Sequence, residues 1–423
     1  MNNAKKIYLD AYLVILALYI YFNKGIAYSF LSEALLLVGL VFVIREFKQL
    51  AIPKDKKSGL LIFFFAIAFL YIIRGKMQQY QWLDVVRDSF IFNYGLFVII
   101  IFFFKDQIPY LLKGIYKIYK WYPLVETVLF LCLTYVPFLA DLKVFGSINL
   151  LHYKYGDMAV HLFISTLFLL NGKIKLAPRF FIVNAVLIAY LFLISASYSR
   201  AGMVCFIISF ILFFVFSKNA VLKTQLKYYI KFIPLVLLVA LPFYLSTSVK
   251  ENFQGRKIGL AQLQDNIASL AISDEGSTLN DNKVWRLVWW TKIIDYTFGG
   301  EYFLAGKGLG MGLAQDDDIA MEDNADLRSP HNFHLNILAR FGVPIFLLWC
   351  FWLYLHFKQF KQPNLSAMNL VFLCIIIMFL LNASFDVFLE GSMGAFPFWT
   401  FIGIYYMNEA FPANNLLMDA DVL

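Results

Sequence analysis

The chain has 423 residues, of which 61% are hydrophobic and 15% charged, and it carries a formal net charge of +8 at pH 7. Soluble domains carry about a quarter charged residues, so this composition excludes an ordinary soluble protein. The apolar residues gather in runs such as "IYLDAYLVILALYIYF" and "FIISFILFFVF". Because a helix needs about 20 apolar residues to cross a bilayer, these runs predict an all-α polytopic membrane protein.

Twelve apolar ranges are predicted to cross the membrane, with one large loop between the ninth and the tenth. They are residues 7–23, 26–44, 59–73, 89–104, 121–140, 158–170, 178–197, 201–216, 229–247, 332–356, 366–384 and 394–411. The chain then divides into spans 1–9 (1–247), the large loop (248–330), spans 10–12 (331–411) and a tail (412–423). The first range lacks a small-residue cleavage site, so it is expected to be a retained helix rather than a signal peptide.

Lysine and arginine mark one side of the predicted spans. With the N-terminus inside, basic residues crowd the inner loops, as at 45–57, 105–120 and 218–231, and they are sparse in the short outer loops. Cytoplasmic loops of membrane proteins carry this excess, so both termini are predicted to be cytoplasmic and the large loop to lie outside. The positive net charge reflects this topology, and no nucleic-acid partner is inferred from it.

The first polar group at the predicted outer face lies in "WLDVVRDSF" (82–90). Arg87 and Asp88 precede the fourth span there. They form either a local ion pair or part of an outer cavity.

Arg200 lies in "SASYSRAGM", the tight outer turn between spans 7 and 8, against the positive-inside trend. Ser197 and Ser199 add hydrogen-bond donors, Gly202 allows close approach, and the start of the next helix adds a positive dipole end. This combination predicts an anion site. The alternative is an interfacial arginine whose charged end reaches to water.

The large loop contains "KVWRLVWWTKIIDY" (283–296), which predicts an amphipathic helix that Asp281 or Asn282 caps. Three residues share one face at helical spacing: Trp285, Trp289 and Ile293. The helix is expected to lie on the membrane surface or to pack on the bundle. Arg286 shares the next face with Trp290, so it either stacks on that ring or belongs to an anion site.

A glycine-rich stretch, "GKGLGMG" (306–312), follows this helix. It is not a P-loop, because Gly308 replaces the Ser or Thr that would follow Lys307. Its amides at Gly308 and Gly310 are candidate phosphate donors, and a flexible connection is the alternative. The acidic stretch at 316–326 does not fit the spacing of a calcium loop and is interpreted as a solvated acidic loop.

The stretch "RSPHNFHLNILARFG" (328–342) leads into the tenth span with polar groups in its first turns. Helical spacing puts His331 and His334 on one face, and Asn332, Asn336 and Arg340 on a second stripe. Ionisable groups at membrane depth usually face a bundle interior or a wet cavity, which predicts a functional site. The alternative is that His331 and Asn332 merely cap the helix. No metal site is predicted, because the helix offers no carboxylate ligand near the two histidines.

The order of these motifs resembles that of the O-antigen ligase and O-antigen polymerase family. "SYSRAG" follows an apolar span, "WRLVWW" leads to "GKGLGMG", and "PHNFHLNILARFG" comes last. The most specific piece is His331 and Asn332, then nine residues, then Gly342. In the ligase form of this motif, two further residues precede Gly, Thr or Tyr. Here Ile345 takes that position, which favours the polymerase over the ligase.

The resemblance implies a GT-C-like fold in the bacterial inner membrane, with the large loop in the periplasm. It implies metal-independent glycosyl transfer without a cofactor, from a glycan on undecaprenyl diphosphate to a glycan or lipid A-core acceptor. Arg200 and Arg286 would hold the diphosphate, and His331 would act as general base on the acceptor hydroxyl. The candidate supporting residues are Asn332, Asn336, Arg340, Arg87, Ser199, Gly308 and Gly310.

Two other classes of protein stay open from the residues alone. A twelve-span transporter or flippase usually places its charges near the midplane between matching halves, whereas this chain shows no matching halves and gathers its polar groups at one face. A non-catalytic scaffold for polysaccharide assembly would tolerate changes at the His and Arg positions. The outer stretch 382–399 adds Asp386 and Glu390, whose roles the sequence does not fix.

Overall fold

The structure is a computed structural model, and it describes residues 3–22, 30–140, 142–144, 148–149, 154–217, 234–246, 259, 262–264, 266–267, 278–319, 327–363 and 365–411. Three features predicted from the sequence therefore lie wholly or largely outside the described residues. They are the basic inner loop 218–231, the first part of the large loop (248–277) and the tail 412–423.

Helices make up nearly all of the described chain, which confirms the all-α prediction. The longer ones are α1 (Asn3–Tyr21), α2 (Leu31–Arg45), α3 (Lys56–Met77), α4 (Trp82–Asn93), α5 (Leu96–Phe103), α6 (Ile108–Tyr135), α8 (Tyr155–Leu170), α9 (Pro178–Tyr198), α10 (Arg200–Phe216), the helix Pro234–Ser246, α13 (Thr278–Phe298), α15 (Phe333–Phe357), α16 (Ala367–Ala383) and α17 (Ser392–Ala410). The short ones are η1 (Phe47–Gln49), η2 (Lys105–Gln107), α7 (Pro137–Ala140), α14 (Leu313–Asp316), η3 (Lys358–Lys361) and η4 (Phe388–Glu390). A small antiparallel pair, β1 (Lys143–Val144) and β2 (Ile148–Asn149), is the one sheet in the described part.

Each predicted span overlaps an apolar helix, but the helices differ in length. In the described residues, three are long and apolar enough to cross a membrane: Lys56–Met77, Arg179–Tyr198 and Phe333–Lys361. A fourth is added if α4 and α5, which are bent by 52°, count as one span. The count of twelve spans and the GT-C-like arrangement therefore remain predictions.

The range 89–104, predicted as one helix, is broken between α4 and α5. The chain turns at Gly95, where a Cβ atom would lie 2.7 Å from the ring of Phe65. Glycine allows the bend to lie close against α3, so the break is explained by packing.

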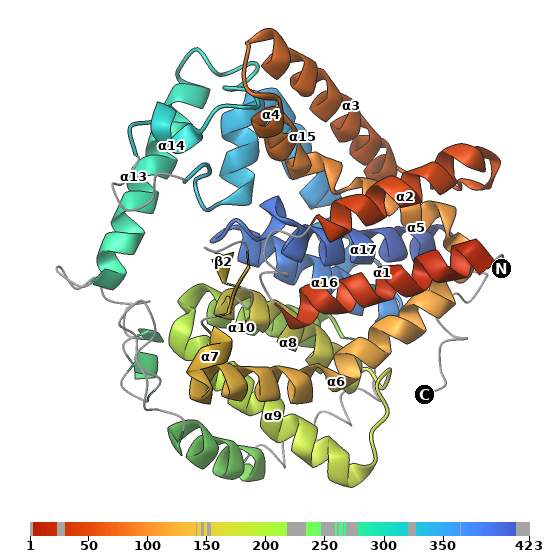
Figure 1. The fold of residues 1–423 in the computed structure, drawn as a ribbon, viewed down its shortest axis with the longest axis vertical. Coiled ribbons are helices and arrows are strands. Elements are labelled where there is room, and N and C mark those ends of the chain that lie inside the picture. The colour runs from red at the N-terminus through yellow and green to blue at the C-terminus, as the bar shows by residue number, and fades with distance from the viewer. Residues whose placement is uncertain are drawn as a thin grey trace.

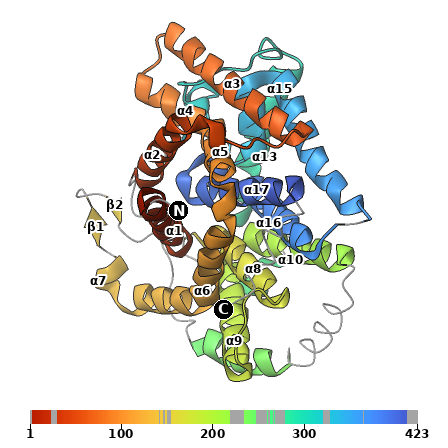
Figure 2. The same ribbon diagram turned by 90° about the vertical axis from the view of Figure 1, so that its right-hand side faces the viewer.

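The centre of the fold is formed by α16 and α17. α16 is apolar on all sides, as expected for a helix that is buried all round, and every residue from Leu370 to Leu380 is buried. It packs on α8, α10 and α17, while α17 packs on α5 and α1. Figure 1 shows α16 and α17 across the middle of the molecule, with α3, α4 and α15 above and α6, α8 and α9 below. Figure 2 shows the same order from a perpendicular direction.

Four of the ion pairs join groups that the charge pattern assigns to the same side. They are Lys5–Glu46 and Lys57–Glu409 on the predicted inner side, and Lys154–Asp386 and Arg340–Asp88 on the predicted outer side. The contacts thus agree with the predicted grouping of the loops. Which side faces the cytoplasm stays a prediction.

The predicted helix at 283–296 is part of α13, which begins earlier, at Thr278. Asp281 and Asn282 consequently lie inside the helix, and the prediction that one of them caps it is wrong. Trp289 and Ile293 are fully buried and pack with residues of α15, among them Ala339. Of the two expected placements, α13 therefore takes the one on the bundle.

Candidate functional site

His331 lies just before α15, in a left-handed backbone conformation. Its φ is +51°, a region that non-glycine residues seldom enter. Asn332 is the N-cap of α15, because its Oδ1 accepts hydrogen bonds from the amides of His334 (3.0 Å) and Leu335 (3.1 Å). The predicted face shared by His331 and His334 is therefore wrong, since the helix begins at Phe333. Costly backbone conformations of this kind gather at functional sites.

His334 is instead a half-buried structural residue. The indole Nε1 of Trp349 donates to its Nδ1 at 3.0 Å, so Nδ1 is an acceptor. Its Nε2 then carries the proton and donates to the carbonyl oxygen of Leu380 at 3.2 Å. Both ring nitrogens are engaged within the bundle.

Groups from three segments surround His331. The ring of Trp285 in α13 meets its imidazole edge-on, with centroids 5.7 Å apart. Burial lowers the pKa of His331 to about 4; Asp386 opposes this shift, and Arg286 and Lys154 add to it. The imidazole is therefore neutral at pH 7 and able to accept a proton.

Arg286 reaches the same place from α13. Its Nη1 donates to the carbonyl oxygen of Phe385 at 3.0 Å, and its guanidinium lies 5.5 Å from the ring centroid of Trp285. Its buried Nε has no hydrogen-bond partner among the described residues. The predicted stacking on Trp290 is wrong, because the structure places Arg286 over Trp285, while Trp290 donates to the carbonyl oxygen of Pro330 at 2.8 Å.

Arg200 is the first residue of α10. Ser199 caps this helix, with its Oγ accepting from the amide of Gly202 at 3.0 Å. The close approach predicted at Gly202 is an approach to α8, because a Cβ atom there would lie 3.0 Å from the Cα of Gly156. Burial lowers the pKa of Arg286, and the positive charge of Arg200 lowers it further. The two guanidinium groups therefore interact electrostatically.

The sequence motifs do not point to an ion pair that joins this group. Lys154, which precedes α8, pairs through Nζ with Oδ1 of Asp386 at 2.5 Å. Close by, the side-chain amide of Asn382 donates to Asp157 at 3.2 Å. The available signal was that Lys154, like Arg200, is a basic residue in a predicted outer loop. The outer cluster comprises His331, Arg286, Arg200, Lys154 and Asp386.

A second set of polar residues, the Arg340 network, lies deeper along α15. Arg340 is only 2% exposed; its Nε donates to Asn336 at 2.9 Å and its Nη1 to Asp88 at 2.8 Å. Its other acceptors are the carbonyl oxygens of Gly308, Met311 and Arg328. Every guanidinium nitrogen is engaged, so Asn336 and Arg340 hold the fold together at this position.

The glycine-rich stretch is packed against the bundle. The amide of Gly308 donates to the carbonyl oxygen of Arg340 at 2.9 Å, and that of Gly310 to Asp88 at 2.9 Å. Three positive φ angles shape the turn, at Gly306, Gly308 and Gly310. The stretch is therefore neither a flexible connection nor, with these amides engaged, a phosphate-binding loop.

Gly342, the glycine of the family motif, interrupts α15. Its φ is +78°, and a Cβ atom there would lie 2.7 Å from the carbonyl oxygen of Phe303. The amide of Val343 donates to that same oxygen at 2.8 Å, and the amide of Lys307 donates to Ala339 at 2.8 Å. The break in α15 leaves the amide of Val343 and the carbonyl oxygen of Ala339 to bond with the 303–307 loop. Glycine is required at this position because a side chain would collide with the docked loop.

Two of the predicted site features have local structural roles. Arg87 is exposed and pairs with Asp84 at 3.1 Å, whereas Asp88 pairs with Arg340, so the predicted local ion pair of Arg87 with Asp88 is wrong. In the acidic stretch, Asp316 and Asp317 bind the ammonium group of the buried Lys307, so this part is not a solvated loop. Residues 320–326 lie outside the described residues.

Glu390 in η4 lies between the outer cluster and the Arg340 network. Burial raises the pKa of its carboxyl to about 7, although Ser329, Arg340 and Asn336 lower it. Its Oε1 is buried and has no hydrogen-bond partner in the described part of the chain. The charge of Glu390 also raises the pKa of Lys154, which links Glu390 to the outer cluster.

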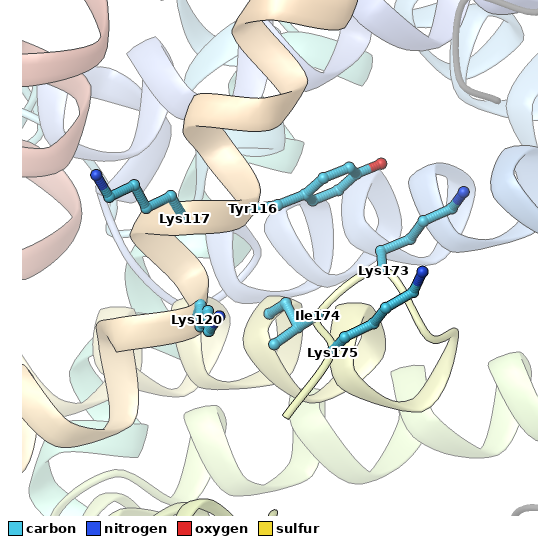
Figure 3. A pocket seen from close by; sticks show the side chains of 6 residues that line it. All are labelled: Tyr116, Lys117, Lys120, Lys173, Ile174 and Lys175. Atoms are coloured by element: carbon cyan, nitrogen blue, oxygen red, sulfur yellow. The ribbon is translucent and has the colours of Figure 1, made fainter. Parts of the chain in front are cut away.

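A separate basic group lies at the predicted inner side (Figure 3). It is formed by Lys117 and Lys120 of α6 and by Lys173 and Lys175 of the loop between α8 and α9, with Tyr116 and Ile174. The cavity between them has about 10 Å³ of room. That is about enough for one water molecule, so the cavity is too small for a diphosphate head group.

Residues 185–350 match the family model described as O-antigen ligase. The match confirms the predicted resemblance, and the matched range contains Arg200, Arg286 and His331. A search of curated proteins found no match to the chain. The matched family and the apolar helices indicate a bacterial integral membrane protein, an enzyme of cell-surface polysaccharide biosynthesis. This family acts in general on lipid-linked glycans.

Proposed function

We propose that the chain is a metal-independent glycosyltransferase of the inner membrane, which transfers a glycan from undecaprenyl diphosphate to a hydroxyl acceptor at the outer face. The outer cluster carries this proposal. The charges of two arginines of the matched range interact there, beside a neutral histidine that has a left-handed backbone. Arginine suits phosphate oxygens, and neutral histidine suits removal of a proton from a hydroxyl.

The reaction breaks the bond between the anomeric carbon of the glycan and the diphosphate oxygen. A hydroxyl oxygen of the acceptor forms the new bond to that carbon. His331 accepts the hydroxyl proton, and the leaving diphosphate develops negative charge. We assign Arg200 and Arg286 the role of stabilising that negative charge, because fixed cations at a leaving group stabilise the transition state. Asp386 stabilises the imidazolium that forms, since its charge already favours protonated His331.

Two acceptors are consistent with this chemistry. A ligase passes the glycan to a lipid A-core or similar acceptor, whereas a polymerase extends it with the next lipid-linked repeat. Ile345 follows Pro344 where the ligase motif has Gly, Thr or Tyr, which favours the polymerase.

The test is complementation in a strain that lacks the gene. Wild type, His331→Ala and the control Arg87→Ala are expressed at equal membrane levels, and surface glycan is compared with the lipid-linked pool. Loss of a general base lowers the rate about 10²–10⁴-fold, so His331→Ala is expected to accumulate lipid-linked glycan while Arg87→Ala behaves as wild type. Accumulated single repeats identify a polymerase, and full-length unattached chains identify a ligase. Normal surface glycan with His331→Ala would refute the proposal.

A further inference from the structure

Lys154 occupies an unusual position for a residue that only forms a structural ion pair. It is the last residue before α8, and its ammonium group pairs with Asp386, which follows α16. The two side chains are 28% and 22% exposed, so the pair is reachable from outside the bundle. Burial alone would lower the pKa of Lys154, but the neighbouring carboxylates outweigh burial and raise it, so the group is charged at pH 7.

Two helix N-termini meet beside this pair. α8 begins at Tyr155 and α10 at Arg200, and Gly156 of one packs against Gly202 of the other. The first turns of both helices therefore lie together. Helix N-termini carry a partial positive charge, which favours phosphate.

Electrostatic interactions link Arg200 to Arg286, and link Arg286 and Lys154 to His331. Arg200 lowers the pKa of Arg286, and both Arg286 and Lys154 lower the pKa of His331. The buried Nε of Arg286 lacks an acceptor among the described residues. A diphosphate offers several acceptor oxygens and more than one negative charge, which more than two guanidinium groups can share.

Building on the proposed function, we propose that Lys154 is a third ligand of the lipid-linked diphosphate, held by Asp386 until the substrate binds. On binding, the ammonium group exchanges the Asp386 carboxylate for a phosphate oxygen. Asp386 then keeps its charge beside His331, where it stabilises the imidazolium formed when the acceptor hydroxyl loses its proton. Lys154 thus couples substrate binding to the proton acceptor.

A purely structural ion pair makes a different prediction. If Lys154 only anchors the start of α8 to the segment after α16, removing both charges together leaves no unpaired group, and substrate binding survives. Lys154→Met alone leaves Asp386 without its partner and risks misfolding. The informative variant is therefore Lys154→Met combined with Asp386→Asn. The matched control is Lys5→Met combined with Glu46→Gln, which removes a pair of the same type at the predicted inner side.

The experiment measures the affinity of the full-length protein in lipid nanodiscs for undecaprenyl diphosphate and for undecaprenyl monophosphate. A hydrogen bond to a charged group is worth about 1.5–3 kcal/mol, so the Lys154/Asp386 double variant is expected to bind the diphosphate about tenfold or more weakly. Its affinity for the monophosphate is expected to fall less, and the Lys5/Glu46 control is expected to bind both lipids as wild type does.

Each result decides the matter. Wild-type affinity of the Lys154/Asp386 variant for the diphosphate, with weak binding by Arg286→Met, would overturn the role of Lys154 and leave the proposed function standing. A wild-type protein that binds neither lipid would overturn the proposed function, and the role of Lys154 with it. Equal weakening of both lipids would show that Lys154 does not recognise the diphosphate in particular and would contradict the inference.

Discussion

The outer cluster and the Arg340 network both contain arginine, carboxylate and backbone carbonyl groups, yet they use them differently. Each nitrogen of Arg340 donates to an acceptor of the protein. Arg286 instead has one recorded acceptor, a backbone carbonyl, and a buried Nε without a partner in the described residues. Arg340 fastens the 306–312 loop to α15 and α4, whereas Arg286 faces another cation and a neutral histidine.

This difference teaches how to recognise a binding arginine in a membrane bundle. A buried guanidinium is costly unless its donors are filled, so a filled one stabilises the fold. A guanidinium that has an unfilled donor and lies beside a second cation is stabilised most when an anion binds. The hypothesis that one arginine is structural and the other functional predicts distinct responses to the same substitutions.

The largest expected effect is the loss of stability on Arg340→Met. Breaking a buried ion pair by removing one partner costs about 3–5 kcal/mol, and here Asp88 loses the closer of its two arginine partners. Unfolding in mixed micelles, followed by tryptophan fluorescence, measures the change. Arg286→Met is expected to cost much less. Exposed Arg87→Met is the control, at about 0–1 kcal/mol. Equal losses for Arg340→Met and Arg286→Met would remove the distinction between the two regions.

The next effect is on turnover, with Arg286→Lys. Lysine keeps the charge but lacks the planar pair of donors, and loss of one stabilising donor at a transition state costs about 10²–10³-fold in rate. Glycan transfer by the purified protein is expected to fall by that amount, while its resistance to unfolding stays near that of wild type. Unchanged turnover would show that Arg286 only packs on Trp285.

A smaller effect on stability is expected for Gly342→Ala. The left-handed backbone at this position costs a non-glycine residue about 1–3 kcal/mol, and the new Cβ would press on the carbonyl oxygen of Phe303. Protease digestion of the folded protein is expected to cut the 303–312 loop faster. Gly391→Ala, where nothing closer than a flexible methionine side chain lies near the new Cβ, is the control. If both variants resist the protease equally, the docking of the loop does not depend on Gly342.

The smallest expected effect is a pH dependence of stability that comes from Glu390, which belongs to neither region. The pKa of its carboxyl is raised from 4.5 to about 7, so the folded state holds this proton more tightly than the unfolded chain does. Its contribution to stability is therefore complete below pH 4.5 and is lost as the pH rises through 7. Glu390→Gln stays neutral and is expected to raise the melting temperature more at pH 8 than at pH 5. A gain of equal size at both pH values would contradict the raised pKa.

The sequence predicts the helices well, because apolar runs of this length have few other structures to adopt. The lysine and arginine bias predicts which loops share a side, and that grouping stays a prediction. The break of α15 at Gly342 is not predictable from periodicity, because the helical pattern continues across it. Only the docking of the 303–308 loop, which is remote in the sequence, explains why the helix stops there.

The candidate site was predictable in its strongest signals only. Arg200 and His331 stand out as polar groups at helix starts in an apolar chain, and Arg286 stands out through its aromatic neighbours. Helical spacing could not separate His331 from His334 or Arg340 from Arg286, because it does not show which donors the folded chain fills. Lys154 and Asp386 meet although they are far apart in the sequence, and no local pattern reports that contact.

The position of Arg340 also bears on the order in which the chain assembles. It lies about two turns inside α15, and an arginine at the centre of an isolated membrane helix costs about 2.5–3.5 kcal/mol during insertion. Asp88 and the carbonyl oxygens of Gly308 and Met311 come earlier in the chain, so synthesis delivers them before Arg340 emerges. Arg340 gains these acceptors only when α15 packs against α4 and the 306–312 loop, so the cost of its burial is offset by tertiary packing rather than within the helix.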